Sequence, residues 1–340
     1  MRILMVTDAW RPQVNGVVHT LERLTETLKS FDVAVEFLTP NIFRTLPLPT
    51  YPDIRLALTT PGHVARLIDS YKADHIHIVT EGPLGIMARR YCRNARRPFT
   101  TSYHTRFPEY LSARLPVPES WTYRWLRDFH NSGQGTLVAT QSLADDLTAR
   151  GFSKLRPWTR GVDTEHFRPD KRKDLGFPGP VFLCVGRVAI EKNLSAFLDL
   201  DLPGSKVIVG EGPELAKLKA KYPQAHFLGH RPNDELAEVY ASADVFVFPS
   251  RTDTFGNVII EALASGTPVA AYPVTGPIDI VGDGFGGAVS NDLHEAALAA
   301  LNISRDQARE RAMRYSWKAS AEMFLDAVEE ALGVKRAIAA

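Results

Sequence analysis

Residues 245–271 read VFVFPSRTDTFGNVIIEALASGTPVAA, and this stretch contains a strand, a loop, a helix and a second strand in that order. The run 245–248 is short and apolar, as expected for a buried strand. The helix is predicted to begin at 254–256 and to end at Gly266, after which the run 269–271 is again apolar. A strand followed by a helix and another strand indicates a parallel sheet with a right-handed crossover.

The same alternation continues through the whole chain of 340 residues. The expected strands are 3–6, 33–38, 75–79, 99–103, 136–140, 181–185, 207–209, 225–228, 245–248 and 269–271. Residues 168–180 are polar and are interrupted by proline and glycine, so they are expected to link two domains. The fold class is therefore α/β, with one domain over 1–168, a second over 178–317 and a last helix, about 318–340, that packs back on the first.

The composition excludes several classes of protein. Apolar residues make up 44% of the chain and charged residues 23%, which is typical of a globular protein and not of a disordered or fibrous one. No run of 18 apolar residues occurs, and the apolar start at 3–6 is too short for a signal peptide, so a cytoplasmic location is expected. Cys92 and Cys184 are the two cysteines, and they predict neither a disulfide framework nor a metal cluster.

The net charge of +1 hides an asymmetry between the halves of the chain. Residues 1–170 hold 22 Lys and Arg against 17 Asp and Glu, and residues 171–340 hold 18 against 22. The halves therefore carry +5 and −4. Within 84–130 there are nine arginines and three acids, a local excess that favours contact with phosphate or phospholipid.

The predicted helix start in the quoted stretch is a candidate anion site. Free N–H groups at a helix N-terminus attract phosphate, and Gly256 lets a phosphate approach the backbone of Thr254 and Phe255. Asp253 precedes the helix, and Glu261 lies one to two turns inside it, where a carboxylate can accept hydrogen bonds from a sugar diol. Taken singly, these residues also fit an ordinary strand–turn–helix with solvated acids.

A second candidate follows the expected strand 181–185. Gly186 and Arg187 come directly after the strand, and Lys192 lies five residues after the arginine. Two cations at a strand end can converge on one diphosphate, the arginine as a fork and the lysine as a movable point charge. A solvated loop with two cations is the plain alternative.

Two more candidates lie at strand ends in the first half of the chain. Gly16 stands at the start of the first expected helix, where it allows a phosphate or a sugar to come close. His104 directly follows an expected strand, although a lone histidine is more often structural than catalytic. His75 and His77 share one face of a strand and are interpreted as packing residues.

Together these segments resemble the motifs of retaining glycosyltransferases with the GT-B fold, in particular glycosyltransferase family 4. The resemblance covers nearly the whole chain and is closest to bacterial lipid-glycosylating members of the diacylglycerol glycosyltransferase type. It implies two Rossmann-like domains with parallel sheets that face each other across a cleft. It also implies a nucleoside diphosphate sugar as the donor substrate, with no metal and no other cofactor.

The resemblance assigns roles to the residues of the second half. Glu261 would bind the nucleotide ribose, and the backbone of 254–256 would bind the phosphates. Asp253 stands where the family usually has Glu and would contact the donor sugar. Arg187 and Lys192 would neutralise the departing diphosphate.

The resemblance also places the remaining candidates. The loop at Gly16 would face the donor diphosphate, and His104 would lie beside the reaction centre. Gly186 belongs to the loop with the two cations, and Gly229 and His230 belong to a loop under the nucleobase. The catalytic candidates are therefore Arg187, Lys192, His104 and Asp253.

The basic region 84–130 is a candidate membrane surface. One expected helix carries arginines on a single face, and a second stretch carries tryptophans at helical spacing, a combination that suits an anionic lipid interface. A solvated basic face over core aromatics fits this pattern equally well, but residues 106–118 resemble the acceptor-side loop of lipid-glycosylating members. The candidate acceptor and membrane residues are Arg89, Arg93, Arg96, Arg106, Trp121 and Trp125.

The prediction from the sequence is a retaining glycosyltransferase that moves a sugar from a UDP- or GDP-linked donor to a membrane lipid such as diacylglycerol. It would act at the inner face of the cell membrane as a peripheral protein, with no nucleic-acid partner. The alternatives are a GDP-mannose-dependent mannosyltransferase with a soluble or polysaccharide acceptor and a non-catalytic sugar-binding protein. A front-face displacement is favoured over a covalent intermediate, because no carboxylate is clearly placed as a nucleophile.

Overall fold

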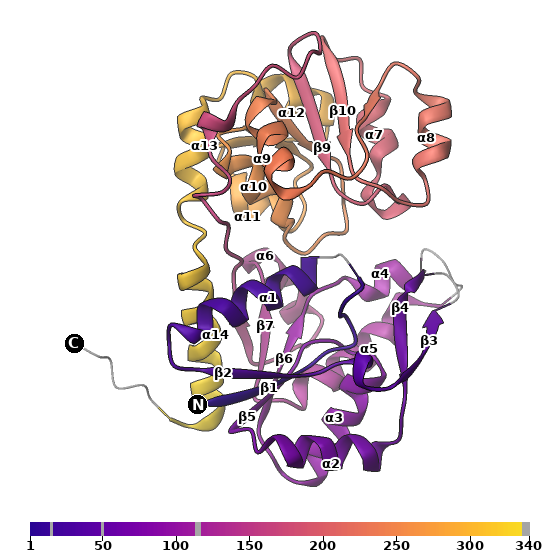
Figure 1. Ribbon diagram of the computed structural model, residues 1–340, viewed down its shortest axis with the longest axis vertical. Coiled ribbons are helices and arrows are strands. Elements are labelled where there is room, and N and C mark those ends of the chain that lie inside the picture. Colours follow the sequence, from indigo (N-terminus) through magenta and orange to yellow (C-terminus); the bar gives the residue numbers. More distant parts are fainter. Residues whose placement is uncertain (14–15, 49–50, 113–116, 335–340) are drawn as a thin grey trace, which may run out of the picture. The chain divides into compact units, whose positions relative to one another are not determined.

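The computed structural model describes residues 1–13, 16–48, 51–112 and 117–334, and the chain divides into two compact units (Figure 1). The N-terminal unit contains Met1–Thr159 together with Trp317–Ala340, and the C-terminal unit contains Arg160–Ser316. Each unit is built around its own six-stranded sheet, as the alternation of strands and helices predicts.

The N-terminal unit has a parallel sheet with the strand order β2-β1-β5-β6-β7-β8. Its strands are β1 (Arg2–Val6), β2 (Ala34–Leu38), β5 (His75–Ile78), β6 (Phe99–Tyr103), β7 (Gly135–Val138) and β8 (Leu155–Pro157). Its helices are α1 (Gly16–Lys29), α2 (Pro61–Tyr71), α3 (Pro83–Asn94), α4 (Phe107–Ser112), α5 (Glu119–Asn131), α6 (Gln141–Ala149) and α14 (Trp317–Leu332). The expected strands of this half are present, and a separate antiparallel pair, β3 (Arg44–Leu48) and β4 (Tyr51–Leu58), is additional.

Helix α14 belongs to the N-terminal unit although it is the last helix of the chain. Phe324 and Leu325 are fully buried and pack in one cluster with Leu21 of α1, which lies beside α14 (Figure 1). Ser320 Oγ donates a hydrogen bond of 2.8 Å to the carbonyl of Thr159. Because a buried Phe or Leu contributes about 1.5–3 kcal/mol, α14 is an integral part of this unit's core.

The C-terminal unit has a second parallel sheet, with the order β11-β10-β9-β12-β13-β14. Its strands are β9 (Val181–Val185), β10 (Ser205–Val209), β11 (His226–Phe227), β12 (Val245–Phe248), β13 (Val269–Ala271) and β14 (Gly287–Val289). Its helices are α7 (Leu194–Leu198), α8 (Leu215–Lys221), α9 (Asn233–Ser242), α10 (Asn257–Ala264), α11 (Pro277–Val281), α12 (Leu293–Ala300) and α13 (Arg305–Ala312). Short 3₁₀ turns lie at Pro40–Ile42, Pro169–Lys171 and Ile190–Lys192.

The expected linker at 168–180 is instead part of the C-terminal unit, and the division between the units falls before it. The N–H of Lys173 donates to Ser242 Oγ at 2.8 Å, and the guanidinium of Arg172 donates to Asp244 Oδ1 at 3.2 Å. A polar stretch rich in proline and glycine can therefore be fixed by hydrogen bonds to residues that lie far away in sequence. The prediction of an interdomain linker here was wrong.

His75 and His77 are packing residues, as predicted. Both are fully buried, and the ring nitrogens His75 Nε2 and His77 Nδ1 each lie 2.8 Å from Thr100 Oγ1. His77 Nε2 lies 2.8 Å from Ser102 Oγ. Burial lowers the pKa of His75 to about 3, so this imidazole is neutral at physiological pH.

Candidate active site

The carboxyl edge of each sheet contains one topological switch point, the position at which open α/β sheets bind ligands. In the C-terminal unit it lies between β9 and β12, because the chain leaves β9 toward β10 on one side and later adds β12 on the other. In the N-terminal unit it lies between β1 and β5 for the same reason.

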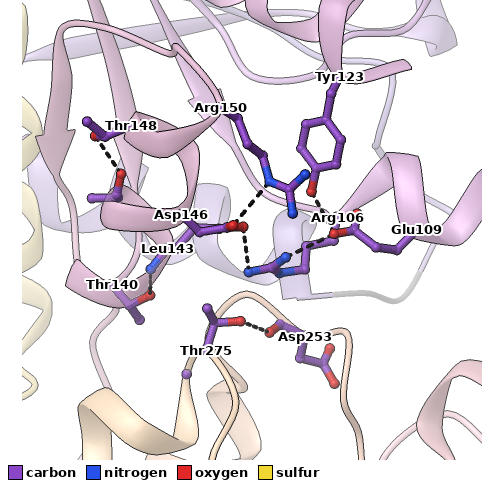
Figure 2. A network of polar contacts seen from close by, with 12 residues as sticks. Arg106, Glu109, Tyr123, Thr140, Leu143, Asp146, Thr148, Arg150, Asp253 and Thr275 are labelled. Carbon is purple, nitrogen blue, oxygen red and sulfur yellow. Dashed lines mark hydrogen bonds and ion pairs between the residues drawn. The ribbon is translucent and has the colours of Figure 1, made fainter. Parts of the chain in front are cut away.

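Lys192 and Asp253 form an ion pair at the switch point of the C-terminal unit. Lys192 Nζ lies 2.6 Å from Oδ1 and 2.9 Å from Oδ2 of Asp253, and the two side chains are 29% and 25% exposed. Asn193, with a left-handed φ of 53°, donates to the carbonyl of Pro249 at 3.1 Å and so ties the two loops together. Thr275 Oγ1 donates to the carbonyl of Asp253 at 3.3 Å (Figure 2).

The loops after β9 and β10 run against each other at their glycines. The N–H of Val188 donates to the carbonyl of Glu211 at 2.8 Å. A Cβ on Gly210 would lie 1.9 Å from the carbonyl oxygen of Gly186, and one on Gly212 would lie 2.4 Å from that of Val188. The stretch 210–212 is a part of the site that the sequence analysis missed, and its signal was a Gly-x-Gly directly after a strand.

The loop after β11 continues this edge of the sheet. The N–H of Gly210 donates to the carbonyl of Gly229 at 2.8 Å, and Gly229 has a φ of 71°, which favours glycine. His230 follows it and is exposed, and Arg187 in the loop after β9 is also exposed. The predicted donor loops at Gly186 and Gly229 therefore follow β9 and β11 of one sheet, with the loop after β10 between them.

Gly256 is the N-cap residue of helix α10 and has no side chain that could cap the helix. Gly256 has a φ of 89°, and Thr254 and Phe255 before it are buried. Gly276, with a φ of 91°, supports this turn from behind, because a Cβ there would lie 2.4 Å from the carbonyl oxygen of Phe255. The helix start is thus a rigid backbone turn with the N-terminal dipole of an eight-residue helix behind it.

Glu261 is half-buried on α10, and Tyr240 Oη of α9 donates to its Oε2 at 3.0 Å. Burial raises the pKa of Glu261 to about 7, and the hydrogen bond from Tyr240 opposes part of that rise. The buried thiol of Cys184 has its pKa raised to about 12 and stays neutral. In the folded protein the pKa of Glu261 therefore lies close to neutral pH.

We expect Glu261→Gln to stabilise the protein at pH 8. The folded-state pKa lies above the usual 4.5, so ionisation of Glu261 destabilises the fold progressively between pH 4.5 and 7. Glutamine removes this penalty, which is on the order of 3 kcal/mol above pH 7. Denaturant unfolding at pH 8 and pH 4.5 measures it, and an equal gain at both pH values would contradict the assignment.

The switch point of the N-terminal unit is occupied by the unit's own carboxylate. Asp8, which follows β1, accepts hydrogen bonds from the N–H groups of Leu84 at 2.9 Å and Gly85 at 3.3 Å, and from Thr80 Oγ1 at 3.1 Å. Burial raises the pKa of Asp8 to about 6, although these hydrogen bonds oppose the rise. Asp8 thereby caps the N-terminus of α3 from a segment that lies far away in the chain.

Gly16 and His104 lie at the carboxyl edge of the N-terminal sheet. Gly16 is the first residue of α1, and its neighbours 14–15 lie outside the described residues. His104 follows β6 and is half-buried, with its ring centroid 5.6 Å from that of the buried Trp158. The structure thus places both residues at a strand end, as predicted, and their contact with a substrate stays a prediction.

Arg106 is held inside a polar network (Figure 2). Its guanidinium lies 2.9 Å from Glu109 Oε1 and 3.0 Å from Asp146 Oδ2, and its side chain is 14% exposed. Tyr123 Oη donates to the same Glu109 oxygen at 2.6 Å. Arg106 joins α4, α5 and α6 and stabilises the segment before 113–116. Arg106 is thus paired with carboxylates of its own unit, and its contact with an acceptor or a membrane stays a prediction.

The predicted basic stripe on α3 and the predicted aromatic stripe on α5 are offset from each other along two neighbouring helices. Helices α3 and α5 run parallel, because each leads from a carboxyl strand end back to the start of the next parallel strand. Arg89 is half-buried and donates to the carbonyl of Asp128 at 2.7 Å, which aligns the two helices. Trp121 lies two turns, about 10 Å, from Asp128 toward the carboxyl edge. The exposed Arg93 and Arg96 lie beyond Arg89 toward the opposite edge.

Exposed apolar side chains lie in the N-terminal halves of these two helices, toward the carboxyl edge of the sheet, and we define this patch as Ile86, Trp121 and Trp125. These side chains are 45%, 70% and 41% exposed. Ile86 is level with Trp125, since each lies three residues before the contact between Arg89 and Asp128. The exposed Arg90 and Arg124 follow Ile86 and Trp121 by one helical turn.

No helix among the described residues is both long enough and apolar enough to cross a membrane. The part of the chain that the structure describes also contains no group of three or more His, Cys, Asp or Glu side chains that is arranged to hold a metal ion.

Two family models match the chain. The model described as Glycosyltransferase Family 4 matches residues 14–166, and the model described as Glycosyl transferases group 1 matches residues 179–306. The first lies within the N-terminal part of the chain, and the second includes the pair Lys192–Asp253 and helix α10.

Curated relatives and solved structures match over most of the chain. A GDP-mannose-dependent alpha-mannosyltransferase from Corynebacterium glutamicum is 31% identical over 92% of this chain and 83% of the relative. An alpha-monoglucosyldiacylglycerol synthase from Streptococcus pneumoniae is 27% identical over 97% and 85%. The structure of Anabaena HepE in complex with UDP has a TM-score of 0.71 at 16% identity, covering 97% of this chain and all of the other, and this likeness confirms the GT-B fold.

Proposed function

Since the chain belongs to glycosyltransferase family 4 and uses a nucleotide sugar, we propose that it transfers a hexose with retention to a membrane lipid such as diacylglycerol. The observation that carries the lipid acceptor is the exposed patch of Ile86, Trp121 and Trp125. Tryptophan suits the boundary between water and lipid, because its ring is apolar and its N–H is polar. The alpha-monoglucosyldiacylglycerol synthase relative supports the same acceptor class.

The proposal places the donor on the carboxyl edge of the C-terminal sheet. The diphosphate would bind at the start of α10 at Gly256, with Arg187 and Lys192 as its cations, and the ribose would bind Glu261. The Asp8 carboxylate supports this choice of unit, because it already occupies the anion site at the start of α3. Asp253 would lie next to the donor sugar.

In the proposed reaction the bond between the anomeric carbon and the diphosphate oxygen breaks while the acceptor hydroxyl oxygen bonds to the same face of that carbon. The hydroxyl proton passes to the departing diphosphate oxygen. Negative charge grows on the leaving group, and Lys192 and Arg187 stabilise it more strongly in the transition state than in the bound donor. A trapped glycosyl-enzyme would instead establish a covalent intermediate.

Membrane attachment would be peripheral, at the inner face of the cell membrane, through the apolar patch and the two arginines beside it. We expect Trp121→Ser/Trp125→Ser and Arg90→Glu/Arg124→Glu each to reduce binding to anionic vesicles at least tenfold. Each arginine near an anionic surface contributes about 1 kcal/mol, and charge reversal replaces attraction with repulsion. Vesicle co-sedimentation at low and high salt is the measurement.

The matched control for this test is Arg93→Glu/Arg96→Glu, which makes the same change of charge at the other end of α3. We expect it to change vesicle binding less than twofold. If this control lowers binding as much as the patch variants do, the docking surface has been misplaced. Failure of the wild type to sediment with anionic lipid would favour a soluble acceptor.

A mannosyltransferase with a soluble or polysaccharide acceptor is the second candidate. The Corynebacterium glutamicum relative named as GDP-mannose-dependent favours a guanine donor. A thermal-shift series with UDP, GDP and their sugars discriminates the bases, since a ligand at a hundredfold excess over its Kd stabilises the protein by about 2.7 kcal/mol. A shift with GDP-mannose alone, together with transfer to soluble glycans, would favour this candidate over the lipid enzyme.

A further inference from the structure

We infer that Asp253 is a built-in competitor of the diphosphate for Lys192 and thereby limits how tightly the nucleoside diphosphate product is held. The inference rests on the proposed function of this site and adds a role in product release to it. Asp253 acts here through Lys192, as a residue that positions the ammonium group and partly neutralises it.

The geometry of the pair carries the inference. Lys192 Nζ contacts both carboxylate oxygens, at 2.6 and 2.9 Å. An ammonium group has three donors, so this arrangement leaves one of them for a phosphate oxygen unless the pair opens. A diphosphate at Lys192 must therefore either share the ammonium with Asp253 or displace the carboxylate.

The surroundings favour sharing over displacement. Asn193 fixes the lysine's loop to Pro249, and Ser250 Oγ donates to the carbonyl of Glu191 at 3.4 Å. Thr275 Oγ1 donates to the carbonyl of Asp253 at 3.3 Å, so the backbone on the acid's side is also held. Since both loops are tied at several points, the carboxylate stays near the ammonium when an anion enters.

Asp253 should lower the affinity for the nucleoside diphosphate product more than the affinity for the donor. Once the sugar has left, the nucleoside diphosphate carries more negative charge than it did as a sugar ester. A carboxylate at hydrogen-bond distance from the same lysine repels that charge and lowers the affinity for the product. Removing the charge of Asp253 should therefore tighten product binding.

The test is calorimetric binding of UDP and of GDP to the full chain and its variants. Asp253→Asn should bind the preferred nucleoside diphosphate at least fivefold more tightly than the wild type, with an equal fall in its product-inhibition constant. Asp253→Glu keeps the charge and should bind within twofold of the wild type. Asp201→Asn also removes one negative charge, but just before β10 at the opposite edge of the sheet, and it should leave the nucleotide affinity unchanged.

A double-mutant cycle assigns the effect to the lysine. In a Lys192→Ala background, Asp253→Asn should change the nucleotide affinity less than twofold. An equal gain in both backgrounds would overturn the competition, because it would show repulsion that does not act through Lys192. Unchanged or weaker binding by Asp253→Asn would overturn it as well. If the wild type binds neither UDP nor GDP, the proposed function itself fails.

Discussion

Lys192→Ala is expected to lower turnover by 100- to 1000-fold while it changes the affinity for the donor sugar nucleotide less than tenfold. The lysine would meet a charge that grows as the leaving group departs, and removal of one such preorganised contact costs on the order of 3 kcal/mol in the transition state. Steady-state kinetics with the preferred donor measure both quantities.

We expect transfer by the wild type to persist in excess EDTA, because Lys192 and Arg187 would neutralise the charge of the departing diphosphate.

The matched control for Lys192→Ala is Lys217→Ala. Lys217 pairs with Glu214 on the surface of the same unit, and its side chain is 72% exposed. It should leave kcat and KM within a factor of two. If Lys192→Ala raises KM in proportion and leaves kcat unchanged, the lysine contributes binding alone, and its catalytic role is wrong.

Gly210→Ala is expected to cost about 4 kcal/mol or more of unfolding free energy, or to prevent folding of the C-terminal unit. Gly210 has a φ of 136°, and its new Cβ would lie 1.9 Å from the carbonyl oxygen of Gly186, which is backbone and cannot rotate away. The loops after β9 and β10 must therefore separate. Denaturant unfolding of the purified protein, or its soluble yield, measures the loss.

Gly284→Ala is the control that separates the steric clash of a new Cβ from the strain of a left-handed backbone conformation. Gly284 also has a left-handed φ, 81°, but no atom lies within 4 Å of an added Cβ. Strain alone costs about 1–2 kcal/mol. Equal losses for Gly210→Ala and Gly284→Ala would mean that the two loops are not packed against each other.

The sequence predicted the parts of the site that depend on position along one strand or helix. Gly256 at the start of α10 and Glu261 in its second turn follow from a local strand–loop–helix pattern. The burial of His75 and His77 follows in the same way, from their alternation in an apolar strand. These predictions succeeded because local periodicity can be recognised without knowing the order of the strands in the sheet.

Contacts between segments that lie far apart in the chain could not be predicted from the sequence. Lys192 meets Asp253 only because β12 returns beside β9 after two other strands have been added on its far side. Asp8 caps α3 through the equivalent return of β5 beside β1. The use of Arg89 and Arg106 within the N-terminal unit likewise depends on which helices become neighbours. Composition shows that arginines are abundant in this region but not which of them remain available to a ligand.

The proposed transfer of a sugar from a nucleotide donor to a membrane lipid can be measured directly. The most direct measurement uses radiolabelled UDP-glucose and GDP-mannose with anionic vesicles that contain diacylglycerol, followed by solvent extraction and NMR of the product's anomeric proton. We predict that label from one donor enters the organic phase as an α-linked glycolipid. Label that stays in the aqueous phase with both donors would contradict the lipid acceptor, and a β-linked product would contradict retention.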